Sequence, residues 1–234
     1  MVARYSAPRI ADLYQRGRTE TLHRTYVFAT TWIVRLSLPA FILLILFPRD
    51  VVAIFGSGFS AAAAVTIVLV VGKAIDAATG PCAMMLKMSG RPALNMADNV
   101  AALALNIGLN LWLIPRYGIL GSAVAWAVAL GVVNLARAVQ VRLTMRMWPF
   151  STEIAVALVA GAAAAVIGVA VRAVVPEPSS LIAGVFLLVA TYVAVIVVWG
   201  LTAEDRTLLS SLRTTARLDL RSSRAHRLES GTRS

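Results

Sequence analysis

Six long apolar runs, separated by short polar stretches, dominate the chain. Each run has about the 20 residues that a helix needs to cross the ~30 Å hydrocarbon core of a bilayer. Backbone groups in lipid must be paired within their own segment, so each run predicts a helix. None alternates between polar and apolar residues as the strands of a membrane barrel do. The pattern predicts an all-α, polytopic membrane bundle with about six transmembrane helices, at 27–47, 61–86, 93–114, 117–141, 153–175 and 180–201.

Polar segments flank this bundle, at 1–26 and 202–234. In the second, Thr202 and Asp205 have the spacing of a capping box, and leucines and arginines follow to about Leu220. This pattern favours an amphipathic helix at the membrane surface, before a Ser- and Arg-rich end. The basic tail is then either a solvated anchor or a lipid-binding element.

Composition agrees with a membrane protein, since 59% of residues are hydrophobic and 14% are charged. The net charge of +11 does not point to nucleic acid, because the basic residues lie between the apolar runs. The N-terminal segment, alternate loops and the tail hold 17 basic residues, against 3 in the other loops. Because basic loops stay in the cytoplasm, the bias predicts a multi-pass protein of the cytoplasmic membrane with both termini inside.

No catalytic constellation is present in the sequence. The single cysteine, Cys82, and the two distant histidines, His23 and His226, provide neither an internal disulfide nor a metal cluster. The sequence has no G-x-S-x-G, H-E-x-x-H or C-x-x-C motif. We therefore expect no enzymatic activity, no cofactor and no metal.

Four charged residues stand out within the predicted spans: Arg35, Lys73, Asp76 and Asp98. A charge inside a bilayer costs roughly 2.5–3.5 kcal/mol or more, so each predicts a partner, a hydrated cavity or a function. Arg35 and Asp76 fall at similar depths if the first two spans run as straight helices. A cluster of cationic and acidic groups inside the bundle is one prediction.

Simpler roles are also open for each charge. Lys73 and Asp76 are three residues apart on one helix face, so they could form a self-neutralising pair. Arg35 could extend toward the cytoplasmic surface, and Asp98 could pair with Arg91 at the interface.

The third predicted span carries several asparagines. Asn99, Asn106 and Asn110 are seven and four residues apart, which places them near one helix face. The stripe could either join two helices by hydrogen bonds or line a cavity.

Several stretches resemble the C-terminal lobe of polysaccharide flippases in the multidrug/oligosaccharidyl-lipid/polysaccharide exporter superfamily. The most specific is residues 110–123, with Asn110, Ile114-Pro115, Tyr117-Gly118 and Gly121-Ser122-Ala123 in the order typical of that family. Residues 8–14, 46–59 and 86–91 resemble the end of a helix, an outer hairpin and a small cytoplasmic loop of the same lobe. The resemblance covers about residues 7–145.

The resemblance implies that the chain, as an incomplete or half-size member of the family, flips a lipid-linked oligosaccharide. The oligosaccharide would serve the biosynthesis and export of a cell-surface polysaccharide, such as lipopolysaccharide or exopolysaccharide. Arg35 and Lys73 are the candidates for binding its charged head group, and Asp76 for ion coupling. Family members have two lobes and 12 to 14 spans, so membrane lipid and a separate first-lobe chain are the implied partners. A multidrug exporter fragment, and a non-transporting subunit or gene remnant, are the alternatives. Two cations against one deep acid argue against a multidrug exporter.

Overall fold

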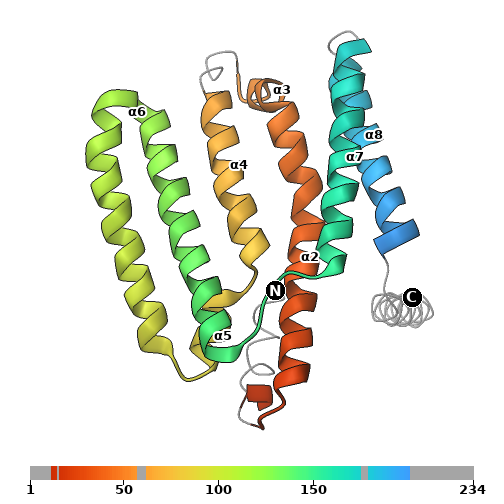
Figure 1. Ribbon diagram of the computed structural model, residues 1–234. Coiled ribbons are helices and arrows are strands. Elements are labelled where there is room, and N and C mark those ends of the chain that lie inside the picture. The colour runs from red at the N-terminus through yellow and green to blue at the C-terminus, as the bar shows by residue number, and fades with distance from the viewer. Residues whose placement is uncertain (1–11, 15, 57–61, 175–178, 201–234) are drawn as a thin grey trace, which may run out of the picture.

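The computed structural model describes residues 12–14, 16–56, 62–174 and 179–200, and within these ranges the regular elements are helices (Figure 1). The segment 1–11 and the tail from residue 201, including its predicted amphipathic helix, lie outside them. The elements are α2 (Thr19–Leu46), α3 (Pro48–Ala53), α4 (Ala62–Thr79), α5 (Cys82–Met88), α6 (Pro92–Met145), α7 (Thr152–Val174), α8 (Ser179–Val195) and the π-helical turn η2 (Ile196–Gly200).

Five of these segments are long and apolar enough to cross a membrane: α2, α4, α6, α7 and the stretch Ala183–Gly200 formed by α8 and η2. The predicted all-α, polytopic bundle is therefore confirmed.

The 54 residues of α6 form a hairpin rather than one rod. A straight helix of that length would be about 80 Å long, far more than a bilayer core. Figure 1 shows α6 rising along one edge of the molecule and returning beside itself. The two halves are bonded together, since the Gln140 amide donates to Asp98 over 2.8 Å. Two of the predicted spans, 93–114 and 117–141, thus lie in α6.

Glycines make the turn of this hairpin. Gly118 has φ 56° and ψ −132°, a conformation that residues with a Cβ rarely adopt. A Cβ on Gly121 would overlap the carbonyl group of Leu113, so only glycine allows the chain to return this tightly.

The second predicted span is wrong in its length. The sequence predicts one helix from 61 to 86, but α4 ends at Thr79 and α5 begins at Cys82. Gly80 has φ +65°, and Pro81 has no N–H to continue the ladder. The Thr79 carbonyl, left without a helical partner, accepts hydrogen bonds from the Tyr26 hydroxyl at 3.0 Å and the Cys82 thiol at 2.8 Å.

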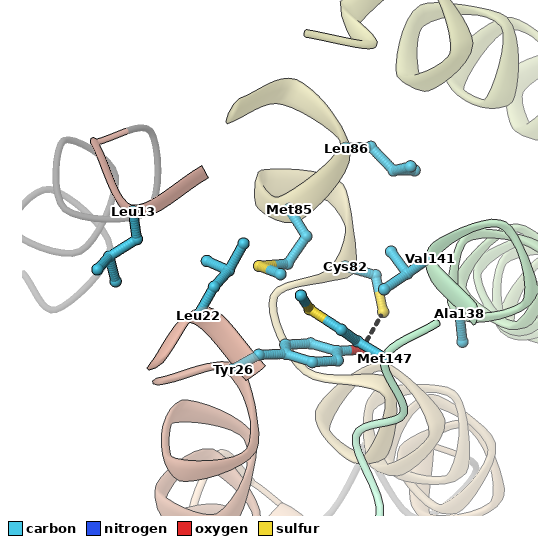
Figure 2. Packing of buried hydrophobic residues seen from close by; sticks show 9 residues of the cluster. All are labelled: Leu13, Leu22, Tyr26, Cys82, Met85, Leu86, Ala138, Val141 and Met147. Atoms are coloured by element: carbon cyan, nitrogen blue, oxygen red, sulfur yellow. Dashed lines mark hydrogen bonds between the residues drawn. The ribbon is translucent and has the colours of Figure 1, made fainter. Parts of the chain in front are cut away.

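A hydrophobic cluster surrounds this break and ties together distant parts of the chain (Figure 2). The contribution of Leu22 and Tyr26 explains why α2 begins at Thr19, eight residues before the predicted first span. These residues bury apolar surface against α5 and α6, which stabilises helix beyond the membrane-length run. The cluster holds Leu13, Leu22, Tyr26, Cys82, Met85, Leu86, Ala138, Val141 and Met147.

The spanning helices are arranged in a row. In Figure 1 the two halves of α6 are followed by α4, α2, α7 and α8, and α4 contacts both α6 and α2, α2 contacts α7, and α7 contacts α8. Close approach depends on small residues at the contacts. A Cβ on Gly72 of α4 would lie 3.0 Å from Ala127 of α6, and one on Gly161 of α7 would lie 2.6 Å from Leu38 of α2.

Candidate functional site

A connected group of polar side chains joins α4 to both halves of α6. We call this group the polar network. It lies in the half of the bundle that also holds α5, since its first and last members on α6 are six residues from the start and five residues from the end of that helix. The network consists of Lys73, Asp76, Asp98, Asn99, Asn134, Arg137 and Gln140.

The exposed end of the network is an ion pair on α4. The Lys73 ammonium donates to Asp76 Oδ2 over 3.0 Å, and the two side chains are 52% and 37% exposed. The same ammonium lies 5.7 Å from the centroid of the Trp126 ring, within the range of a cation–π contact. The ion pair that the sequence spacing allows between Lys73 and Asp76 is therefore formed. Lys73 also contacts Trp126 of the neighbouring helix.

Asp76 connects this pair to the interior. Its other oxygen, Oδ1, accepts a hydrogen bond of 2.8 Å from the Asn134 amide of α6. The Asn134 side-chain oxygen in turn accepts from Arg137 over 3.3 Å. Because the amide has one donor end and one acceptor end in use, Arg137 fixes the orientation in which Asn134 donates to Asp76.

The buried end of the network is a second ion pair, across the α6 hairpin. Arg137 Nε lies 3.7 Å from Asp98 Oδ2, and the two side chains are only 9% and 10% exposed. Arg137 also donates to Asn99 over 2.6 Å, and Gln140 donates to the other Asp98 oxygen over 2.8 Å. Two charges in an apolar surrounding are tolerated because they are paired and hydrogen-bonded.

Two sequence interpretations are corrected here. The basic bias counts Arg137 among the 17 basic residues of the loops and ends, although the predicted span 117–141 contains it, and in the structure this arginine lies inside α6 and is buried. The expected partner of Asp98 is Arg91, but its observed partners are Arg137 and Gln140. Both errors concern the α6 hairpin, whose second half continues to Met145 and carries the arginine alongside the first half.

The network holds two cations, Lys73 and Arg137, and two acids, Asp76 and Asp98. Its formal charges balance. The excess of deep cations that argues against a multidrug exporter is therefore not found in this group, and charge alone does not separate the two kinds of substrate.

Arg35 lies apart from this network. It shares a side of α2 with Leu38 and Ile42, which approach Gly161 of α7. The buried Arg35 guanidinium donates to the carbonyl of Gly200 at the end of η2, and Tyr192 of α8 donates to the Arg35 carbonyl over 2.9 Å. The predicted cluster of Arg35 with Asp76 is not formed by these contacts.

A second arginine has the same geometry at the other end of the bundle. Arg172 of α7 donates to the carbonyl of Leu46, the last residue of α2. Cations at the carbonyl end of a helix satisfy groups left without helical partners and oppose the helix dipole. The contacts of Arg35 and Arg172 are those of helix-capping residues.

The asparagine stripe is divided between two kinds of contact. Asn99 accepts from Arg137 and so belongs to the polar network. Asn110 donates to both the backbone and side-chain oxygens of Asn106, at 2.8 and 3.1 Å. All three lie on the side of α6 that holds the buried Asp98 and Leu113, toward its second half. Asn99 therefore joins the two halves of α6, whereas the bonds between Asn106 and Asn110 lie within its first half.

The opposite side of α4 and α6 is apolar. A groove of about 430 Å³ lies between them, lined by residues between Ile67 and Ile75 of α4 and between Val124 and Leu135 of α6. At 3.6 residues per turn, Lys73 and Trp126 lie on the other side of their helices from most of these lining residues. The pair of helices thus has one polar face and one apolar face.

Sequence reasoning missed four residues of this site: Asn134, Arg137 and Gln140 of the polar network, and Trp126 beside it. A signal was available, since Asn134 and Arg137 are three residues apart and therefore share a helix face. The partner across the hairpin could not be predicted from the sequence, because it depends on the register set by the turn at Gly118. Among the described residues, no group of histidine, cysteine and acidic side chains has the arrangement of a metal site.

Comparison with known proteins gives a partial sequence match. The chain is 27% identical over 132 residues, 56% of its length, to the Haloferax volcanii protein described as "Probable low-salt glycan biosynthesis flippase Agl15". The match spans 28% of that protein, so the matched region is less than a third of its length. No protein-family profile matches the chain, and no solved structure matches it.

Proposed function

We propose that this chain is part of a transporter that moves a lipid-linked glycan across the cytoplasmic membrane. The observation that carries the proposal is the sequence similarity, over more than half of the chain, to a protein described as a glycan biosynthesis flippase. The helical membrane bundle is an architecture that such transport can use. In this proposal the chain binds and moves its substrate and performs no covalent chemistry.

The polar network provides a surface for the part of the substrate that does not dissolve in lipid. A glycan head group has many hydroxyl groups, and each one that enters the bilayer core without a partner costs free energy. Lys73, Asp76 and Asn99 offer donors and acceptors within the bundle, while the hydrocarbon chain of the lipid can remain beside apolar helix surfaces.

The residue roles follow from exposure. Lys73 is the candidate for contact with the head group, because half of its side chain is accessible. Asp76 is the candidate for ion coupling, because it is the more accessible acid of the network and shares its two oxygens between Lys73 and Asn134. For Arg35 we propose a structural role in place of substrate binding, since its contacts join α2 to α8 and η2.

A second helical bundle completes this proposal. Contact between a half-exposed ion pair and lipid costs free energy. We therefore expect water or another protein segment to cover the exposed face at Lys73. Transporters that alternate between two open states place their site between two such halves. We propose that a first lobe, on a separate chain or in a longer polypeptide, covers the polar face. The basic bias of the loops favours a cytoplasmic location for the α5 side of the bundle.

The proposal is tested by locating the lipid-linked glycan in cells that lack this chain. Without it, the glycan should accumulate in the cytoplasmic leaflet, protected from an impermeant glycosidase added to intact cells. A plasmid copy should restore access, a Lys73→Ala copy should restore less, and a Lys87→Ala copy, altered at an exposed residue of α5, should restore it fully. An unchanged leaflet distribution in the deleted strain contradicts the proposal.

A further inference from the structure

The surroundings of Lys73 combine a cation, an acid and an aromatic ring on the accessible side of two helices. Lys73 lies 3.0 Å from Asp76 and 5.7 Å from the Trp126 ring centroid, and both charged side chains are partly exposed. Asp76 is held from behind by Asn134, and Asn134 by Arg137. The network behind the ion pair therefore fixes the position of its acid.

The position of the Trp126 ring is fixed by close packing of the two helices. A Cβ on Gly72, the residue before Lys73, would lie 3.2 Å from a ring carbon of Trp126. Glycine at this position lets the indole lie against the α4 backbone, beside the ammonium of the next residue. A larger residue at 72 would displace the ring from the ion pair.

The charge of this group indicates the kind of ligand it takes. A site for a doubly charged phosphate would present unpaired cations, whereas here Lys73 is paired with Asp76 and Arg137 with Asp98. A paired ammonium and carboxylate can still exchange hydrogen bonds with neutral hydroxyl groups, one as donor and the other as acceptor. An indole face, which carries partial negative charge, attracts the weakly positive C–H groups on one side of a sugar ring.

We propose that Lys73, Asp76 and Trp126 form a subsite for a neutral sugar ring, with Trp126 under the ring and the ion pair at its hydroxyl edge. The proposal rests on the proposed glycan transport and narrows it. This face recognises the sugar portion of the head group, and the phosphate portion binds elsewhere.

The test compares two soluble probes on the purified full chain in nanodiscs: a farnesyl diphosphate that carries a neutral disaccharide, and farnesyl diphosphate alone. Calorimetry should show tighter binding of the sugar-bearing probe. Saturation-transfer NMR should show contact with the C–H groups of one sugar face. Trp126→Leu should weaken the sugar-dependent part of the binding by about three- to tenfold, the range expected for one aromatic contact, and Trp126→Phe should retain most of it.

Trp112→Leu is the matched control. Trp112 also lies beside a cation, with the Arg116 guanidinium 4.9 Å from its ring centroid, but it is on the first half of α6 near the hairpin turn, away from the network. Binding should be unchanged in this variant, and its melting temperature should match that of Trp126→Leu. Equal binding of the two probes, or equal loss in the two leucine variants, overturns the subsite. The cellular assay of glycan location does not depend on this result, so the subsite can fail while the transport function stands.

Discussion

Arg137 shows how a single side chain can decide the arrangement of a membrane hairpin. It contacts Asp98 and Asn99 on the first half of α6 and Asn134 on its own half. In the sequence it resembles a loop residue that sets topology, because it lies near the predicted end of an apolar run. Whether such an arginine is a loop residue or a buried residue of the helix depends on its distance from the helix end. Helix ends are the least certain feature of an apolar pattern.

The buried pair should show strong coupling between its members. Arg137→Gln leaves Asp98 without its counter-ion, and Asp98→Asn leaves Arg137 without its counter-ion. Each single change should therefore lower the free energy of unfolding by about 3–5 kcal/mol. The double variant should lose less than the sum of the two, because neither charge remains alone. Denaturant titration in detergent measures the three values. Losses that simply add would contradict a direct pair.

The matched comparison is the exposed pair of Arg24 and Glu20, which are bonded over 2.8 Å near the start of α2 with side chains 69% and 80% exposed. Surface pairs of this kind contribute about 0–1 kcal/mol. Arg24→Gln should therefore have almost no effect on stability in the same titration.

Among the elements, the apolar pattern predicted most spanning segments and failed at the break between α4 and α5. The run 61–86 is largely apolar throughout, so its hydropathy gives no reason to end a helix at Thr79. Gly80-Pro81 was the available signal, since proline cannot continue the hydrogen-bond ladder and the residue before it avoids the helical conformation. The break is also stabilised by the hydrogen bond from the Tyr26 hydroxyl of α2 to the Thr79 carbonyl. This is a tertiary contact, so the sequence around residue 80 could not predict it.

Gly80 should be the most sensitive glycine of this break. Its φ of +65° disfavours any residue with a Cβ by roughly 1–2 kcal/mol. A Cβ there would also overlap the Thr30 side chain, which is fully buried and cannot easily move away. Gly80→Ala should therefore lower the melting temperature of the purified chain.

Two other glycines separate the effect of the positive φ from the effect of the overlap with Thr30. Gly90 also has a positive φ, +76°, but open space around it, whereas Gly108 is helical with open space. Gly90→Ala should lower the melting temperature less than Gly80→Ala, and Gly108→Ala should leave it unchanged or raised. An equal effect at positions 80 and 90 would show that the contact with Thr30 is unimportant.

At the scale of the whole molecule, the charge of the loops predicts which end of the bundle faces the cytoplasm. The packing of the helices does not predict this orientation. The C-terminal ends of α2 and α7 and the α6 turn lie at one end of the bundle, and α5 lies with the ends of α6 at the other (Figure 1). Of the described basic residues, Lys87, Arg91, Arg142 and Arg146 lie at the α5 end. We expect reporters fused after Arg49, Arg116 and Arg172 to read as external and those at Gly90 and Pro149 as cytoplasmic. The opposite pattern in the same fusions would invert the proposed orientation.

The α4–α6 pair has two unlike faces, and the proposed transport depends on them. One carries Lys73, Asp76, Trp126 and Asn99, and the other carries the apolar groove, which includes Val128 and Val132. Hydropathy along the chain predicted that these segments span the membrane. It could not tell which face is hydrated, because that depends on how α4 and the two halves of α6 are rotated against one another.

Cysteine labelling in intact membranes measures this directly. The background replaces Cys82 by Ser; burial raises the pKa of the Cys82 thiol, so little background reaction is expected even before the change. Single cysteines at Lys73 and Asn99 should react with a small water-soluble thiol reagent, and cysteines at Val128 and Val132 should be protected. Equal labelling of the two sets, or protection of the first set with reaction of the second, would contradict a polar, hydrated face on α4 and α6.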